Sequence, residues 1–426
     1  MTLRRRLSAI ALGGAALALL VAASNASVPE NALEAAPAEP PRPAAPPSRR
    51  FESWPRWTGW SEQCPFHIAP QHALPASPRW APCSAAGVAA PACRSLVVDG
   101  PHGEAHALAV APLARVTSTG RVLLSFTELA AAYKRWIVAD ADGPVHAAIA
   151  QPRHPGPRCT LVESGLRDDR AAWLVRGDGS SAVSSSRADA LVTFAFDDRA
   201  PRVIFQNHDA VVSNWVAGER FLVRSAAPAR RAEAYAPSGE FLATLHDPRA
   251  DPEHLPLAGN PPLVEGDAVF FEVGDSRTRA LHAFDGRTTR PLLRWPLTDA
   301  RAAGNLGSDG RVLVWTEGRA PLGDGRYQRT EVMTSPIATD PGALRPRRVA
   351  VDPNALIGAA PFTVGCQRAA HWTPEGLLLV HLETGQSTTL PAPTNARWGR
   401  PLAVTCDELF VTYFVGARAG ILRLKV

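Results

Sequence analysis

Short apolar runs that follow a glycine recur along the chain from about residue 116 onward. The run GRVLLSF at 120–126 returns almost unchanged as GRVLVW at 310–315, and looser copies begin at Gly218 and Gly266. These runs are rich in Val, Leu and Phe, bounded by turn residues and nearly continuous in hydrophobicity, which is typical of strands buried on both faces. Their spacing of roughly 40 to 50 residues is the repeat length of propeller blades. The pattern predicts an all-β chain built from repeated sheets.

A second recurring element is a tight polar turn between strand-like runs. Asp-Gly and Ser-Gly sequences form hairpins readily, so we expect these turns to join the third and fourth strands of each repeat. The turns lie at 140–143, 197–199, 237–240, 285–287, 339–342 and 383–386. Second strands then begin near residues 121, 171, 219, 267, 311, 367 and 408, which predicts seven repeats.

The last of these repeats is one strand short, because Val426 falls in what the pattern makes a third strand. We expect an N-terminal strand to complete the C-terminal blade and close the ring, with residues 105–110 as the candidate, since closure removes exposed strand edges. The predicted fold is a β-propeller of four-stranded antiparallel blades over residues 95–426. Seven blades are favoured, and a hairpin at 95–103 leaves eight as the alternative.

The strand-turn-strand units that end in FDGR at 284–287 and ETGQ at 383–386 resemble blades of the TolB-like and quinoprotein-like β-propeller group. The resemblance covers about residues 95–426. It implies the propeller fold and carries no functional residues over to this chain.

The first 26 residues have the pattern of a secretory signal peptide. Three arginines at 4–6 precede an apolar stretch at 7–23, and small residues follow at Ser24 and Ala26. We expect cleavage after Ala26 and a secreted or periplasmic protein with no membrane span. Anchoring by an uncleaved N-terminal helix is the alternative, because the apolar stretch approaches the length that spans a bilayer.

Two further N-terminal segments differ in composition from the repeats. Residues 27–50 are rich in Pro and Ala with few large apolar groups, which predicts a disordered, extended tether. Residues 51–94 contain cysteines and the closely spaced Trp54, Trp57 and Trp60. Because large exposed apolar patches are uncommon on soluble proteins, we expect this segment to pack onto the propeller as a strap.

The six cysteines suit an exported chain, in which disulfides persist. Cys83 and Cys93 are close enough in sequence to close one hairpin. Cys366 and Cys406 occupy equivalent places between the first and second strands of successive repeats, and would pair if their Cα atoms lie within about 7 Å. Both pairs are candidates, and other pairings stay open. The spacing fits no CxxC zinc pattern, so we predict no metal site.

Charge and composition narrow the range of partners. The formal charge is +5, and three of the arginines behind it lie in the predicted leader, while acids and arginines alternate elsewhere, as in RDDR at 167–170. Nucleic-acid binding requires a basic stripe on one face, so we expect no nucleic-acid partner. Of the 45 Lys and Arg residues, only Lys134 and Lys425 are lysines, and such a preference for arginine is typical of a GC-rich bacterial genome.

The sequence offers no recognisable catalytic motif. It contains no HExxH, GxSxG or P-loop pattern, so the catalytic residues are unknown and we predict no cofactor. Gly274-Asp275-Ser276 is predicted to be a turn, and the histidine pairs His67/His72 and His102/His106 are predicted to be solvated loop residues. Long polar connections at 177–187, 246–257 and 318–328 are candidate ligand-binding loops.

These features favour a non-enzymatic binding or interaction scaffold over an enzyme. The expected protein is a monomer that binds an unidentified protein or glycan outside the cytoplasm. The alternative is a propeller hydrolase or lyase acting on carbohydrate or lactone substrates, whose acid and base come from different blades and leave no linear motif. Close carboxylates of raised pKa at the channel mouth would favour that alternative.

Overall fold

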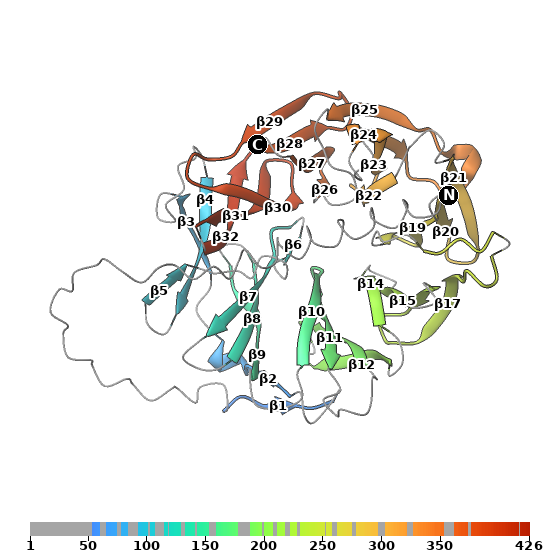
Figure 1. The fold of residues 1–426 in the computed structure, drawn as a ribbon. Coiled ribbons are helices and arrows are strands. Elements are labelled where there is room, and N and C mark those ends of the chain that lie inside the picture. The colour runs from blue at the N-terminus through green and yellow to red at the C-terminus, as the bar shows by residue number, and fades with distance from the viewer. Residues whose placement is uncertain are drawn as a thin grey trace, which may run out of the picture. The chain divides into compact units, whose positions relative to one another are not determined.

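The described strands form seven antiparallel sheets, five with four strands and two with six (Figure 1). A computed structural model describes residues 53–426 except 60–64, 75–77, 84–92, 101–102, 107–114, 118, 129–132, 141–142, 153–158, 178–187, 198–199, 208–210, 218–221, 228–230, 252, 258–261, 275–277, 297–302, 322–326, 353–361, 374–375 and 417. The predicted signal peptide (1–26) and tether (27–50) lie outside the described residues.

Five of the sheets consist of four consecutive strands each, paired in chain order. The second sheet has β10 (Cys159–Leu166), β11 (Arg170–Gly177), β12 (Ala188–Ala195) and β13 (Pro201–Asn207). The third has β14 (Val211–Ala217), β15 (Leu222–Ala227), β16 (Arg231–Tyr235) and β17 (Phe241–His246). The fourth has β18 (Leu263–Glu265), β19 (Ala268–Gly274), β20 (Thr278–Phe284) and β21 (Thr289–Pro296). The fifth has β22 (Ala303–Ser308), β23 (Val312–Pro321), β24 (Tyr327–Pro336) and β25 (Arg347–Asp352). The sixth has β26 (Phe362–Gly365), β27 (Arg368–Thr373), β28 (Gly376–His381) and β29 (Ser387–Pro391).

The first and seventh sheets also take in strands from the N-terminal segment. The first sheet runs from β6 (Arg115–Val116) through β7 (Val122–Glu128), β8 (Tyr133–Ala139) and β9 (Val145–Pro152) to β2 (Phe66–Ile68) and β1 (Arg56–Trp57). The seventh runs from β30 (Arg397–Val404) through β31 (Glu408–Val415) and β32 (Arg418–Lys425) to β4 (Cys93–Gly100) and β3 (Arg79–Pro82), with β5 (Gly103–His106) paired to β4. Among the described residues, two short 3₁₀ helices, η3 (Gln71–Ala73) and η7 (Pro341–Ala343), lie in connections.

The partner of the C-terminal strand differs from the expected one. β32 pairs with β4, where Leu422 lies opposite Ser95 and Leu424 opposite Cys93. The prediction that residues 105–110 pair with the C-terminal strand is therefore wrong. Residues 105 and 106 belong to β5, which pairs with β4, and 107–110 lie outside the described residues. The physical reason is that β4 carries the apolar side chains, since Leu96 and Val97 are 3% and 1% exposed. The hairpin at 95–103 belongs to this same sheet.

The N-terminal segment extends the outer edges of two sheets. β1 and β2 continue the first sheet beyond β9, and β3 continues the seventh beyond β4. Trp54 and Trp80 are buried in the core between these two sheets. His67, predicted to be solvated, is instead buried in β2, with Nδ1 3.4 Å from the carbonyl oxygen of Trp54. Within the described part of the chain, no helix is long and apolar enough to cross a membrane.

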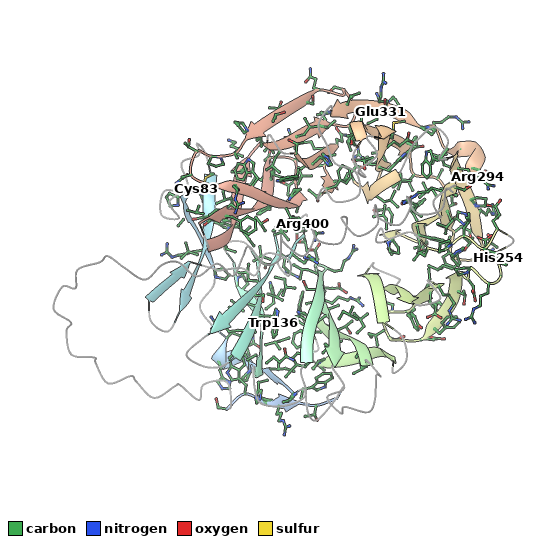
Figure 2. All side chains as sticks on the ribbon, in the orientation of Figure 1. Cys83, Trp136, His254, Arg294, Glu331 and Arg400 are labelled. Atoms are coloured by element: carbon green, nitrogen blue, oxygen red, sulfur yellow. A yellow bond between two sulfur atoms is a disulfide. The ribbon has the colours of Figure 1, made fainter. Side chains whose placement is uncertain are left out.

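The core consists of layers between neighbouring sheets. One hydrophobic cluster fills each interface between successive sheets, and another lies between the seventh and the first. Trp136, labelled in Figure 2, packs between the first and second sheets together with Trp173. β19 shows why the strands read as continuous apolar runs: Phe271 faces the third sheet and Phe270 the fifth. Side chains alternate between faces, and both faces are buried.

The six predicted polar turns fall where the sequence places them, between the third and fourth consecutive strands of each of the first six sheets. At 285–287 the carboxylate of Asp285 accepts hydrogen bonds from the backbone N–H groups of Arg287 (2.9 Å) and Thr288 (2.7 Å). Gly286 has a φ of 89°, which an L side chain rarely adopts. Local side-chain bonding of this kind fixes the 285–287 turn independently of the rest of the sheet.

Both candidate cysteine pairs form disulfides. Cys83 and Cys93 join β3 to β4, with Cα atoms 5.6 Å apart. Cys366 and Cys406 join the sixth sheet to the seventh, with Cα atoms 5.0 Å apart. The second pair is close because β26 and β30 pack tightly: a Cβ added to Gly365 would lie 2.2 Å from the carbonyl oxygen of Val404.

Candidate functional site

A hollow of about 310 Å³ opens between the sixth and seventh sheets, and we call it the aromatic pocket. It lies at the edge where β27 turns into β28 and where β29 leads into β30. Its described lining consists of three aromatic residues, one arginine and three small residues: Trp372, Trp398, Phe414, Arg397, Thr373, Gly376 and Ala392.

The two indole rings are fixed by hydrogen bonds to the backbone. Trp372 Nε1 donates to the carbonyl oxygen of Trp398 (3.2 Å), and Trp398 Nε1 donates to the carbonyl oxygen of Leu390 (3.1 Å). Both bonds cross between the sixth and seventh sheets. Because both N–H groups are occupied, the rings offer a ligand their apolar faces rather than their donors.

Glycines and a tight turn shape the rest of the pocket. A Cβ on Gly376 would lie 2.3 Å from the carbonyl oxygen of Leu390, and one on Gly399 would lie 2.7 Å from the ring of Phe414. The hydroxyl of Thr373 accepts a hydrogen bond from the Gly376 N–H (3.2 Å) and closes the turn between β27 and β28. The walls are therefore preformed, which reduces the entropy lost when a ligand binds.

Burial divides the pocket into a floor and a rim. Trp398 is 7% exposed and Thr373 4%, whereas Trp372 and Phe414 are half-buried and Arg397 is exposed. The floor offers flat ring faces with negative electrostatic potential, and the rim offers a planar five-donor guanidinium. No carboxylate or histidine occurs among the described lining residues. The described lining residues can bind a ligand by stacking and by charge.

Three buried glutamates form a second cluster, between the fourth and fifth sheets. Glu317 and Glu331, labelled in Figure 2, are each 3% exposed and lie directly opposite each other on β23 and β24. Glu317 Oε1 accepts from Trp315 Nε1 (2.9 Å) and from Trp295 Nε1 (3.0 Å). Glu272 on β19 pairs with Arg279 at 2.8 Å. Two adjacent carboxylates are what acid–base catalysis needs, and here both are buried between sheets, where Glu317 accepts hydrogen bonds from two indoles.

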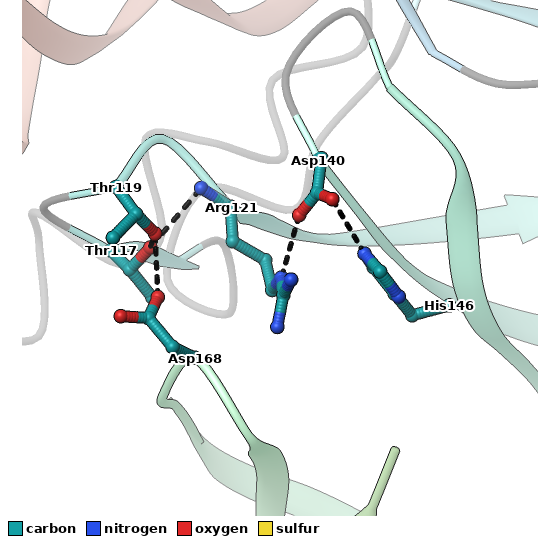
Figure 3. Close-up of polar contacts among 6 residues, drawn as sticks. All are labelled: Thr117, Thr119, Arg121, Asp140, His146 and Asp168. Atoms are coloured by element: carbon teal, nitrogen blue, oxygen red, sulfur yellow. Dashed lines mark hydrogen bonds and ion pairs between the residues drawn. The ribbon is translucent and has the colours of Figure 1, made fainter. Parts of the chain in front are cut away.

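A polar network joins the turns of the first and second sheets (Figure 3). Asp140 accepts from Arg121 Nε (2.7 Å) and lies 2.8 Å from His146 Nε2, and Thr119 donates to Asp168 of the second sheet (2.6 Å). Burial alone raises the pKa of Asp140, but the hydrogen bonds and charges of Arg121 and His146 outweigh it and lower the pKa below its ordinary value. Asp140 therefore stays ionised and ties together strands of the first sheet, while the Thr119–Asp168 bond links that sheet to the second.

His371 lies one residue before Trp372 on β27, and its ring contacts Phe362 on β26, on the face toward the fifth sheet. Burial lowers its pKa from the ordinary value of 6.5 to about 4. Between pH 6.5 and about pH 4, the imidazole of His371 is therefore protonated in the unfolded chain and neutral in the folded chain. Folding stability contributed by neutral His371 is present above pH 6.5 and is lost as the pH falls toward 4.

We expect urea unfolding to show this loss, amounting to about 3 kcal/mol between pH 7 and pH 4. The variant His371→Phe keeps a ring at this position and removes the titration, so its unfolding free energy should fall less over the same pH range. His282, whose pKa burial also lowers to about 4, stays in both proteins and supplies a common background. Equal pH slopes in the two proteins would contradict the assignment.

The sequence did not single out the aromatic pocket. Of the three candidate loops, 178–187 and 322–326 lie outside the described residues, and the described part of 246–257 packs beside the fourth sheet, where Glu253 pairs with Arg294 at 2.7 Å. The sequence did contain one signal for this pocket. Trp372 lies near the last residue of β27 and Trp398 near the first residue of β30, and these two strand ends lie at the same edge of their sheets.

Comparisons with known proteins support the fold. Neither a protein-family model nor a curated protein sequence matches the chain. An oligogalacturonate lyase in complex with manganese matches with a TM-score of 0.52 at 12% identity, over 83% of this chain and 97% of that one. The β-propeller domain of the Trilobed protease from Pyrococcus furiosus matches with a TM-score of 0.45 at 7% identity, over 73% of this chain and 95% of that one.

A prolyl endopeptidase structure matches with a TM-score of 0.46 at 14% identity, over 63% of this chain, and the match spans only 40% of that protein. At 12% identity, the likeness to the oligogalacturonate lyase shows the fold alone. The chain is an all-β propeller of antiparallel four-stranded blades, as the repeat pattern predicts.

Proposed function

We propose that this protein is an exported, non-enzymatic β-propeller that binds a glycan in the aromatic pocket. The observation that carries the proposal is the pair of fixed indole rings, Trp372 and Trp398, beside the exposed Arg397. Sugar rings present flat C–H faces of positive potential that suit an indole face, and a guanidinium fits their hydroxyl or carboxylate oxygens. A preformed concave site with few polar groups is the usual form of a small-ligand site.

In this proposal the seven sheets are the seven blades of one closed ring of the TolB-like or quinoprotein-like kind, and β4 is the strand that closes it. The contact of β30 with β6, and the apolar cluster between the seventh and first sheets, support closure. An eighth blade is disfavoured because the β4–β5 hairpin belongs to the seventh sheet.

Export rests on the leader pattern of residues 1–26, and the disulfides agree with it, since such bonds persist in oxidising compartments. The protein then acts as a secreted or periplasmic monomer, with residues 27–50 as a tether and 51–94 as a strap. The strands β1 to β3, paired to the propeller sheets, support the strap.

The binding proposal is tested with the full mature chain on an array of neutral and acidic oligosaccharides, followed by calorimetric titration of each glycan that binds. We expect Trp372→Ala to weaken binding by at least about tenfold, since it removes one stacking face. Arg397→Gln should weaken acidic glycans more than neutral ones. Phe241→Ala, at a side chain that is 53% exposed on the third sheet, is the matched control and should bind normally.

A blank array, or a bound glycan whose affinity is unchanged in both folded pocket variants, would overturn the proposal. The second candidate is a hydrolase or lyase acting on carbohydrate or lactone substrates, and the opposed pair Glu317 and Glu331 is the observation that favours it. Its test is product release from the bound glycans: turnover by the native chain that Glu331→Gln abolishes would replace the binding proposal with an enzymatic one.

A further inference from the structure

Most polar side chains that line the aromatic pocket are already hydrogen-bonded within the protein. The indole N–H groups of Trp372 and Trp398 both donate to backbone carbonyl oxygens. The hydroxyl of Thr373 accepts from the Gly376 N–H (3.2 Å) and donates to the Gly376 carbonyl oxygen (3.3 Å). Among the described lining residues, Arg397 alone has a polar side chain whose donors are not engaged. Polar recognition of a ligand in this pocket therefore falls to one guanidinium.

Strand pairing fixes the position of this guanidinium beside the aromatic rings. Arg397 lies directly opposite Phe414 in the β30–β31 pair, so the two side chains share a face. The indole of Trp372 reaches the same strand from the sixth sheet, because its Nε1 donates to the carbonyl oxygen of Trp398, the residue after Arg397. One ligand in the hollow can therefore touch ring faces and the guanidinium at the same time.

We infer that the glycan bound in the aromatic pocket is an acidic one, and that Arg397 recognises the carboxylate of a hexuronate residue. This inference rests on the proposed binding of a glycan there, and it names the class of sugar. The aromatic faces stack on the C–H face of a sugar ring whether or not the sugar carries a charge. They do not separate a hexuronate from the neutral sugar of the same shape, so the separation depends on Arg397.

A carboxylate suits a single guanidinium better than a hydroxyl or a sulfate ester does. With a neutral hydroxyl the guanidinium forms a hydrogen bond, whereas with a carboxylate it adds the attraction between opposite charges. The planar fork of donors also matches the two oxygens of a carboxylate with two parallel bonds. The free oxygens of a sulfate ester point in three directions, and the described lining offers unengaged donors from one side only.

The surroundings of Arg397 set how strongly the charge acts. No carboxylate among the described lining residues competes for the guanidinium. Arg397 is exposed at the rim, so water and salt partly screen its attraction for an anion. Binding of a hexuronate should therefore weaken as the ionic strength rises, whereas binding of its uncharged ester should change little.

The size of the hollow suits one residue of the glycan. Its volume of about 310 Å³ is at the lower end of the range for small-ligand sites, which is about 300 to 1,000 Å³. The hollow therefore takes one sugar ring with its carboxylate, and the rest of the glycan lies outside it. A hexuronate monosaccharide should accordingly compete with the oligomer for the site.

The test is calorimetric titration of the full mature chain with short oligomers of glucuronate and of mannuronate. The same oligomers as methyl esters are the matched ligands, since they keep the ring and lose the charge. We expect the native chain to bind the better acid at least about tenfold more tightly than its ester. In Arg397→Gln the acid should lose this advantage while the ester binds as before. Arg397→Lys keeps the charge without the planar fork, so its preference should be intermediate.

Two further variants separate charge from stacking and from nonspecific attraction. Trp372→Ala removes a stacking face, so it should weaken acid and ester alike and leave their ratio unchanged. Arg287→Gln, in an exposed turn of the fourth sheet, removes an arginine elsewhere and should keep the native preference. Thermal unfolding of each variant confirms that it is folded.

Equal affinities of the native chain for acid and ester would overturn this inference and leave glycan binding intact. Tighter binding of sulfated oligomers than of hexuronates would also overturn it, as would equal losses of preference in Arg397→Gln and Arg287→Gln. A chain that binds no glycan at all would overturn the proposed function itself, and this inference with it. The two failures are therefore distinguishable.

Discussion

A chain that lacks residues 1–101 is expected to lose cooperative folding and to aggregate. The deletion removes β4 and so exposes the edge of β32, whose Ile421 and Leu422 are fully buried. An unpaired apolar strand edge is a template for association with other chains. It also removes Trp54, Trp80 and Leu96 from the core between the seventh and first sheets.

The size of the loss follows from these side chains. Removing a buried tryptophan costs about 3 to 5 kcal/mol and a buried leucine about 2 to 5 kcal/mol. Whole domains are stable by only about 5 to 15 kcal/mol, so losing all three leaves little or nothing. Circular dichroism during urea titration, with light scattering, measures both the loss of the transition and the aggregation.

Two controls separate the seam from the rest of the N-terminal region. A chain that lacks only residues 1–47 keeps every described strand and should unfold like the mature protein. The substitution Leu96→Asp keeps the full length and all six cysteines, and should lower the unfolding free energy by several kcal/mol because it buries a charge in the same cluster. A cooperative, native-like transition in the 1–101 deletion would contradict the role of β4.

The repeat could be predicted from the sequence because its determinants are local. A turn such as 285–287 is fixed by the Asp285 carboxylate and by one glycine with positive φ, and both are visible in a window of four residues. Strands such as β19 are visible because both faces are buried, which makes their apolar runs continuous. Cys366 and Cys406 could be recognised as equivalent positions because each follows the first strand of its repeat, while their pairing stayed one of several alternatives.

The seam and the pocket could not be predicted, because both depend on how separate segments meet. Two N-terminal segments had strand character, and the choice of β4 over 105–110 depends on the buried positions of Leu96 and Val97. Trp372 and Trp398 are distant in sequence and meet through a hydrogen bond between sheets. Glu317 and Glu331 face each other only because β23 and β24 pair in that register.

Replacing both Cys366 and Cys406 by alanine should lower the unfolding free energy by about 4 kcal/mol. The bond links residues 40 apart and so closes a long loop in the unfolded chain, whereas Cys83 and Cys93 are only 10 apart. The constraint on the unfolded chain grows with the logarithm of loop length, so the double alanine variant of Cys83 and Cys93 should lose about 3 kcal/mol.

The two double variants control for each other, because each removes one disulfide and leaves no unpaired thiol behind from that pair. Urea unfolding of both, under conditions that keep the remaining disulfides oxidised, gives the comparison. The linked positions differ in a second way: Cys366–Cys406 joins two sheets, while Cys83–Cys93 joins neighbouring strands that β-pairing already holds together. Loop length and sheet linkage both predict a larger loss of unfolding free energy in the Cys366/Cys406 variant. A larger loss in the Cys83/Cys93 variant would show that the bond between sheets is not the stronger constraint.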